Sequence, residues 1–254
     1  MSHKLEISQH FSRAAVGYTQ HNELQRQCAA YLLAQLPAEE LGVTLDIGCG
    51  PGVNSEVLQQ RASHYVGMDL AVGMLQQAQQ RLPALHWVQG DMEHLPLAPA
   101  SVHTLYANLA LQWADQPLAA LRQWVACVKP QGRIVASTVL QGSLQPLSGY
   151  LLRYTGHRRH NSFLTYQELQ QQLALLNGVA ITVEQQTMTV RYPTVLAMLH
   201  QLKGIGANYQ YQARPGLTKG QLQRVATAME IHRDPQGLLP LHWQIAFITL
   251  RKTQ

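Results

Sequence analysis

The sequence predicts an α/β protein with a doubly wound, mostly parallel sheet and a helical cap inserted late in the chain. Two observations predict the sheet: short apolar runs alternate with amphipathic stretches between residues 44 and 140, and a glycine-rich loop follows the first run. Repeated strand–helix alternation requires right-handed crossovers, which place helices on both faces of a parallel sheet. A third observation predicts the cap, because helical segments separate the later strands.

The elements follow in order along the chain. Apolar spacing over 22–36 predicts an amphipathic helix that Pro37 ends. In the alternating region we expect strands at 43–48, 65–70, 85–92, 102–111 and 132–140, and helices at 54–62, 73–82 and 117–128. Residues 142–176 look mainly helical, 179–192 and 239–252 are expected strands, and a helical segment runs from 195 to about 229.

We therefore expect a single domain over 1–254 in several parts. Residues 1–40 would form an N-terminal arm and helix over the cofactor, 41–141 the cofactor-binding core, and 142–176 with 193–235 the helical cap, with final strands at 179–192 and 239–252. The first twenty residues lack the apolar run of a signal peptide, and no later stretch approaches the ~18 apolar residues of a membrane helix. Three scattered cysteines show no disulfide or metal-ligand spacing, so we expect a cytoplasmic protein without a metal.

The charge is unevenly distributed along the chain. Residues 1–149 carry 8 Lys/Arg against 10 Asp/Glu, a balance of −2, whereas residues 150–254 carry 11 against 4, a balance of +7. A basic second half is typical of a protein with an anionic partner, although a solvated basic surface would explain it equally well.

The loop "DIGCGPG" (46–52) raises the question of which ligand it holds. A glycine loop after a first strand often cradles a pyrophosphate, but the dinucleotide fingerprint is G-x-G-x-x-G and the spacing here is G-x-G-x-G. Asp46, two residues before Gly48, would repel a pyrophosphate and attract the zwitterionic amino acid end of S-adenosylmethionine. The loop therefore favours the methyl donor over NAD.

Suitable residues also stand at the ends of the next three strands. Asp69 can accept both hydroxyls of a ribose, Asp91 can accept an adenine amino group beside Met92, and Asn108 ends the fourth strand. The candidate cofactor-binding residues are Asp46, Gly48, Gly50, Asp69, Leu70, Met74, Asp91, Met92, Asn108, Leu109 and Trp113.

These motifs resemble two nested families. Residues 44–140, with "DIGCGPG", resemble a class I S-adenosylmethionine-dependent methyltransferase. "FSRAAVGY", "LDIGCGPG", "NLALQW", "LQGSL" and "LKGIGA" together resemble the malonyl-acyl-carrier-protein O-methyltransferases of biotin synthesis over nearly the whole chain. Three features depart from that pattern: Ala71 stands where a helix-capping serine is common, His103 lies where "FD" is common, and "RYTGHRRHNSFLTYQEL" (153–169) matches only loosely.

The resemblance implies methyl transfer from S-adenosylmethionine to the free carboxylate of a malonyl group on acyl carrier protein, an acidic partner, with neither nucleic acid nor membrane involved. The nucleophile is already ionised at neutral pH, so no general base is needed. The resemblance places Tyr18 over the sulfonium and its methyl as the catalytic residue. Candidates for holding the substrate carboxylate or the carrier are Lys203, Arg13, Arg153, Arg158 and Arg159.

The sequence is also compatible with other functions. A methyltransferase for a quinone precursor or a free dicarboxylate would use the same donor site with a different cap. The basic and aromatic stretch "NYQYQAR" (208–214) offers slight support for nucleic-acid binding, without any recognised RNA-binding module. A nicotinamide oxidoreductase and a catalytically silent regulator are further alternatives.

Overall fold

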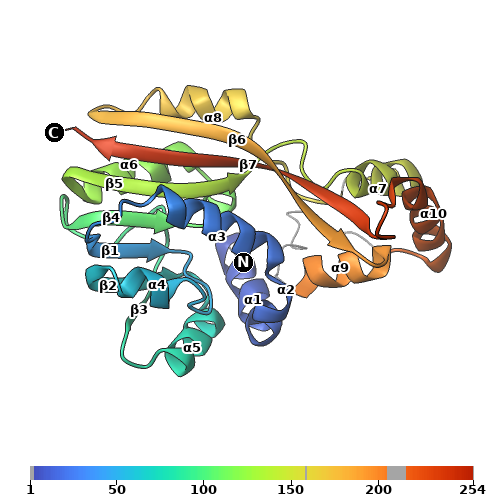
Figure 1. Cartoon of the computed structure of the whole chain (residues 1–254), viewed down its shortest axis with the longest axis horizontal. Coiled ribbons are helices and arrows are strands. Elements are labelled where there is room, and N and C mark those ends of the chain that lie inside the picture. The colour runs from blue at the N-terminus through green and yellow to red at the C-terminus, as the bar shows by residue number, and fades with distance from the viewer. Residues whose placement is uncertain (1–2, 158, 205–215, 254) are drawn as a thin grey trace.

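The computed structural model describes residues 3–157, 159–204 and 216–253 and shows one seven-stranded sheet in the order β3-β2-β1-β4-β5-β7-β6 (Figure 1). The first five strands of that order are parallel, and β7 runs antiparallel between β5 and β6. The strands are β1 (Gly42–Ile47), β2 (Ala62–Asp69), β3 (His86–Gln89), β4 (Val102–Ala107), β5 (Val128–Val139), β6 (Val179–Tyr192) and β7 (Leu239–Lys252). The predicted fold class is confirmed.

The helices begin where local sequence favours a start. Pro117 opens α6, and capping boxes formed by Thr165 with Glu168 and by Thr218 with Gln221 open α8 and α10. The helices are α1 (His3–Ala14), α2 (Tyr18–His21), α3 (Glu23–Gln35), α4 (Ser55–Gln59), α5 (Val72–Arg81), α6 (Pro117–Cys127), α7 (Leu147–Thr155), α8 (Tyr166–Leu173), α9 (Val195–Gly204) and α10 (Lys219–Met229), with single 3-10 turns at η1 (Ala15–Gly17), η2 (Leu111–Trp113) and η3 (Glu230–His232). In the described part of the chain, none of these helices has the length and apolar character needed to cross a bilayer.

Most predicted elements are confirmed, and two differ. The predicted strand at 102–111 ends at Ala107, because Leu109 adopts a φ of 52° and the chain then turns through η2. Helix α1 occupies residues for which the sequence predicted no regular element. Helix α5 starts without a side-chain cap at Ala71, as the sequence indicated.

Two hydrophobic clusters pack on opposite faces of the sheet. Successive residues of β4 alternate between them: Leu105 packs with α6 and α8, whereas Tyr106 packs with α3. This alternation follows from the period of two in a strand, and it explains why the central strands are apolar on both faces. Helices therefore cover the sheet on both sides, and its edge at the carboxyl ends of the parallel strands is left for a site.

The cap is built on a ribbon that extends beyond the sheet. Strands β6 and β7 pair along their whole length, from Val179–Lys252 to Tyr192–Leu239, but β5 pairs only with residues 245–251 of β7. Figure 1 shows α9, α7 and α10 gathered at the projecting end of this ribbon.

The expected cap segment 142–176 therefore divides between two places. Helix α7 packs with α10, whereas α8 packs against α6 and β6 on the face of the sheet. Leu169 and Leu173 of α8 are fully buried there, so hydrophobic burial holds α8 to the core. Residues 205–215 of the expected segment 193–235 lie outside the described residues.

The glycine-rich loop between β1 and α4 turns through left-handed backbone. Gly48, Gly50 and Gly52 have φ values of 67°, 57° and 75°, a region where residues with a Cβ are strained. The N–H groups of Gly48 and Cys49 both donate to the Met68 carbonyl at the end of β2, at 2.8 and 3.1 Å. A Cβ on Gly48 would lie 2.9 Å from the Ala110 Cβ, so the loop also needs the missing side chain for close packing.

Replacing Gly48 with alanine is expected to destabilise the fold. The left-handed backbone costs an L-residue roughly 1–2 kcal/mol, and the contact with Ala110 adds to it. Gly220 in α10 is the matched control, because a Cβ there meets nothing within 4 Å and alanine favours a helix by about 1 kcal/mol. Urea unfolding should therefore place Gly48→Ala below and Gly220→Ala at or above the wild-type midpoint; an unchanged Gly48→Ala midpoint would contradict the assigned strain.

Candidate active site

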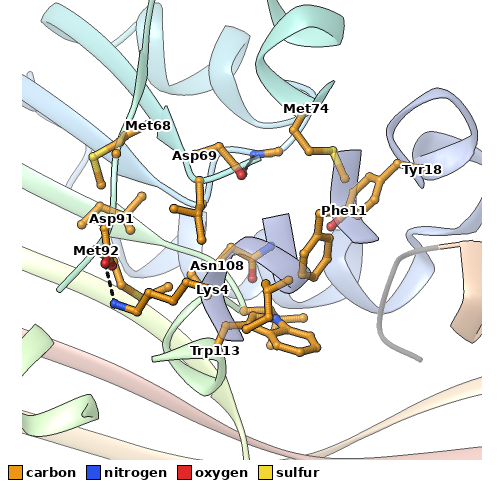
Figure 2. Close-up of a pocket in the computed structure, with 18 residues that line it drawn as sticks. Lys4, Phe11, Tyr18, Met68, Asp69, Met74, Asp91, Met92, Asn108 and Trp113 are labelled. Atoms are coloured by element: carbon orange, nitrogen blue, oxygen red, sulfur yellow. Dashed lines mark hydrogen bonds and ion pairs between the residues drawn. The ribbon is translucent and has the colours of Figure 1, made fainter. Parts of the chain in front are cut away.

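The main cavity of the described structure opens at the carboxyl ends of the parallel strands and encloses about 720 Å³, its mouth included (Figure 2). Every predicted cofactor-binding residue except Asp46 lines it. Those present are Gly48, Gly50, Asp69, Leu70, Met74, Asp91, Met92, Asn108, Leu109 and Trp113, together with the predicted catalytic residue Tyr18. Four strand ends therefore converge on one space, as the parallel topology requires.

Asp46 lies in an adjoining side cavity of about 380 Å³. Its side chain is 2% exposed and accepts a hydrogen bond of 2.8 Å from the Tyr65 hydroxyl. Burial raises the pKa of Asp46 to about 7, against the opposing effect of the Tyr65 hydrogen bond. Gly48 and Gly50 line both cavities. Asp46 therefore lies beside the main cavity, and the other predicted cofactor-binding residues line that cavity itself.

Asp69 ties the end of β2 to the glycine loop. Its carboxylate accepts the Gly50 N–H at 2.9 Å and the Ala71 N–H at 2.8 Å. Burial raises the pKa of Asp69 to about 6, although these backbone hydrogen bonds favour the ionised form. The main and side cavities thus contain two acids that lose their protons near neutral pH.

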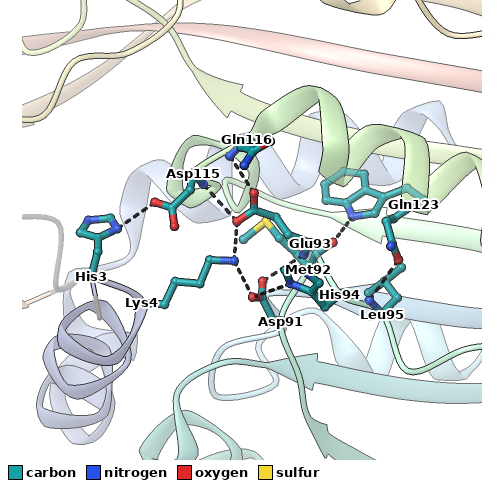
Figure 3. A network of polar contacts seen from close by, with 11 residues as sticks. His3, Lys4, Asp91, Met92, Glu93, His94, Leu95, Asp115, Gln116 and Gln123 are labelled. Atoms are coloured by element: carbon teal, nitrogen blue, oxygen red, sulfur yellow. Dashed lines mark hydrogen bonds and ion pairs between the residues drawn. The ribbon is translucent and has the colours of Figure 1, made fainter. Parts of the chain in front are cut away.

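Asp91 is engaged in a polar network that the sequence did not reveal (Figure 3). Lys4 of α1 forms ion pairs with Asp91 and Glu93, the Glu93 N–H donates to Asp91 Oδ1 at 3.0 Å, and His94 Nδ1 lies 3.3 Å from Oδ2. Burial acts to raise the pKa of Asp91, but the hydrogen bonds from Lys4, Glu93 and His94 outweigh it and hold this pKa below its ordinary value. A carboxylate accepts about four hydrogen bonds, so one acceptor position on Oδ1 has no partner among the described residues.

Helix α1 forms part of the wall of the main cavity. It contributes Lys4, Ile7 and Phe11, none of which was predicted. Ser12 in the same helix accepts the Gly73 N–H at 3.1 Å, which joins α1 to the start of α5. No sequence feature links Lys4 to an acid 87 residues away, and only the folded chain brings them together.

A second cavity, of about 570 Å³, adjoins the main one. The two share Phe11, Tyr18, Leu109 and Trp113, and the Phe11 and Trp113 rings meet edge to face at 5.1 Å. Tyr18 lines all three cavities, and burial followed by the nearby Asp69 charge raises its pKa well above the ordinary value. Its hydroxyl therefore stays protonated at neutral pH.

The predicted basic residues lie elsewhere. Among those described, Lys203 is exposed on α9, Arg13 donates to the Gln9 carbonyl at 3.2 Å, Arg153 is exposed on α7, and Arg159 contacts Thr155 at 3.4 Å. None of the four lines any of the three cavities, and Arg158 lies outside the described residues. The role of these residues in holding the substrate or its carrier therefore stays a prediction.

No metal centre is apparent in the residues that the structure covers. Groups of three or more His, Cys, Asp or Glu side chains arranged around a common point are absent from them. Cys28, Cys49 and Cys127 are buried free thiols.

Comparison with known proteins places this geometry in a family. Residues 45–136 match the model of a methyltransferase domain. The fold is similar to the YcgJ protein of Bacillus subtilis (TM-score 0.64, 14% identity, 90% of this chain and 99% of that one) and to an S-adenosylmethionine-dependent methyltransferase of Mesorhizobium loti (TM-score 0.53, 17% identity, 88% and 96%).

Two curated relatives match along almost their whole length. The malonyl-[acyl-carrier protein] O-methyltransferase of Enterobacter lignolyticus is 34% identical over 95% of both chains, and that of Pectobacterium atrosepticum is 35% identical over 96% of this chain and 95% of its own. Identity of this extent over about 95% of both chains, together with the match to a methyltransferase domain, shows an S-adenosylmethionine-dependent methyltransferase. The chain belongs to the malonyl-acyl-carrier-protein O-methyltransferase family.

Proposed function

We propose that this enzyme transfers a methyl group from S-adenosylmethionine to the free carboxylate of malonyl-acyl carrier protein, giving the methyl ester that primes pimeloyl and biotin synthesis. The observation that carries the proposal is the pair of adjoining cavities, one ringed by strand-end acids and the other mostly apolar, with Tyr18 in the boundary between them. The names of the full-length relatives support the same acceptor.

The residues of the main and side cavities fit the cofactor. Asp69 at the end of β2 suits the ribose hydroxyls, and Asp91 with Met92 suits the adenine. In the side cavity, Asp46 suits the α-ammonium and Arg26 suits the α-carboxylate of the methionine end. Asp46 is buried with a raised pKa, and its hydrogen-bond partner is the Tyr65 hydroxyl and not a cation, which supports its pairing with the ammonium of a ligand.

The protein itself has to position the two reactants and exclude water from them. When bound, the cofactor supplies a methyl group made electrophilic by its positive sulfur. Tyr18 presents a neutral aromatic ring at the junction of the cavities, and such a ring beside a sulfonium stabilises it by about 1 kcal/mol. Alignment of the acceptor oxygen with the methyl carbon is worth roughly 7–11 kcal/mol of the barrier, so a site without a general base is sufficient.

The charge of the cap suits an acidic carrier protein. Helices α7 and α10 pack together and carry the exposed cations Arg153, Lys219 and Arg224. A basic surface of this kind would steer an acidic carrier and attract the phosphate of its prosthetic group. The stretch 208–214, on which the nucleic-acid alternative depended, lies outside the described residues. We propose that the basic half serves the carrier protein and not a nucleic acid.

The acceptor can be tested directly. Incubation with labelled S-adenosylmethionine and malonyl-acyl carrier protein should yield a base-labile methyl ester, because the ester forms on a carboxylate. The Asp69→Asn variant is the matched control and should lose most of the activity, since its carboxylate closes the glycine loop. Label on a quinone precursor or a free dicarboxylate, and none on the malonyl group, would overturn the assignment.

Charge reversal tests the carrier surface. Changing Arg153, Lys219 and Arg224 to Glu should lower kcat/KM for malonyl-acyl carrier protein roughly tenfold or more, mainly at low salt. Activity with malonyl-coenzyme A should change much less. The variant Arg81→Glu/Arg122→Glu, on α5 and α6 of the core, is the control and should match wild type. Equal losses in both variants would exclude a dedicated docking surface.

Cofactor affinity should depend on pH. The ligand's ammonium favours ionised Asp46, whose pKa is about 7, so affinity for S-adenosylhomocysteine should rise roughly tenfold between pH 5.5 and 7.5. Asp69, with a pKa of about 6, contributes in the same direction over the lower part of that range. Calorimetric titration of Asp46→Asn should show weaker binding and a shallower rise. A wild-type affinity that does not change with pH would argue against these carboxylates as ligands.

A further inference from the structure

With S-adenosylmethionine in the main cavity, as proposed above, the adjoining second cavity would receive the methyl acceptor. Phe11, Tyr18, Leu109 and Trp113 form its boundary with the main cavity, so a group inside it faces whatever methyl is presented there. In-line transfer requires the attacking oxygen and the methyl carbon about 3 Å apart, which confines the acceptor carboxylate to this boundary. The remaining walls include Leu24, Val139 and Leu144, which suit a short acyl chain.

The lining of the second cavity contains one residue that can be cationic. Among the described residues around it, His160 is the single basic side chain, and there is no Asp or Glu. Gln112 is committed to the backbone, because its Nε2 donates to the Leu109 carbonyl at 2.6 Å and its Oε1 accepts from the Val139 N–H at 3.4 Å.

Buried polar atoms of two other lining residues indicate that a polar ligand belongs here. Within the described structure, Gln25 Oε1 and Trp243 Nε1 are shielded from water and have no hydrogen-bond partner. Buried polar groups are paired in native proteins as a rule, so their presence beside a cavity points to a polar group that is supplied from outside the chain.

The imidazole of His160 is held in a defined orientation. Its Nδ1 lies 2.7 Å from the Asn161 carbonyl oxygen, and its ring stacks on Phe163 with centroids 5.7 Å apart and planes 6° apart. A carbonyl oxygen only accepts hydrogen bonds, so Nδ1 must carry a proton. Protonation at Nε2 therefore decides whether the ring is neutral or cationic.

Building on the proposed function, we propose that the second cavity binds the malonyl end of the thioester and that His160, as the imidazolium, binds its carboxylate. One carboxylate oxygen forms the new bond to the methyl carbon while the carbon–sulfur bond breaks and its electron pair returns to sulfur; no proton is transferred. The product is an uncharged ester, which has lost its attraction to His160. The same contact therefore selects a malonyl over an acetyl thioester and weakens product binding.

The proposal is tested by comparing two ligands that differ in one carboxylate. Binding of malonyl-pantetheine and acetyl-pantetheine is measured in the presence of S-adenosylhomocysteine, for wild type, His160→Gln and His160→Lys. His160→Gln keeps a hydrogen-bond donor without the charge, so its preference for the malonyl ligand should fall roughly tenfold. His160→Lys restores a cation and should recover part of that preference. In turnover, His160→Gln should raise KM for the malonyl acceptor more than it lowers kcat.

Val139→Ala is the control for packing. It shortens an apolar wall of the second cavity and keeps His160 and its stacking partner, so it should weaken the two ligands alike. Unchanged binding of S-adenosylhomocysteine in every variant would show that the main cavity is intact. If wild type methylates the malonyl thioester and His160→Gln retains the full malonyl preference, the role of His160 is overturned while the proposed function stands. If wild type does not methylate the malonyl thioester, both proposals fail.

Discussion

The pair of hydrogen bonds that Asp69 accepts from Gly50 and Ala71 is the constraint on which the rest of the site depends. One carboxylate joins the loop after β1 to the start of α5, so both strand ends are set at the same edge of the sheet. The loop can reach Asp69 because Gly48 and Gly50 adopt left-handed backbone that a side chain would strain. The walls of the main cavity are consequently positioned before any ligand arrives, and binding need not order them.

Burial of acids gives this preformed site its electrostatic character. Asp46 and Asp69 are kept near the point of ionisation by desolvation, which disfavours their charged forms until a cation is present. Asp91 differs because Lys4 is already paired with it, and its pKa is lowered. Lys4 of the N-terminal helix thus compensates the charge of Asp91, whereas the charges of Asp46 and Asp69 can be compensated by a positively charged ligand.

The extension of β6 and β7 beyond the sheet separates the cap helices from the strand ends that line the cavities. The parallel strands support the cavities, and the projecting ribbon carries α9 and α10, on which Lys203, Lys219 and Arg224 are exposed. Helix α7 follows β5 in the chain and packs against α10 at the end of this ribbon. The exposed charges of the cap are therefore held on elements other than the strand ends that line the main cavity.

The sequence by itself determined the fold class and the seven strands. It also identified, as candidate cofactor ligands, ten of the residues that line the main cavity. These features could be predicted because strand periodicity and the glycine loop are local patterns, and because a parallel sheet places its strand ends at one edge. The sequence did not determine which distant residues complete the site. Lys4, Phe11 and His160 reach the cavities through helix docking and loop packing, and no local pattern encodes such contacts. Lys203 and Arg153 were selected from the sequence for their charge, but the tertiary structure leaves them exposed, since charged side chains stay in water unless a partner compensates for burial.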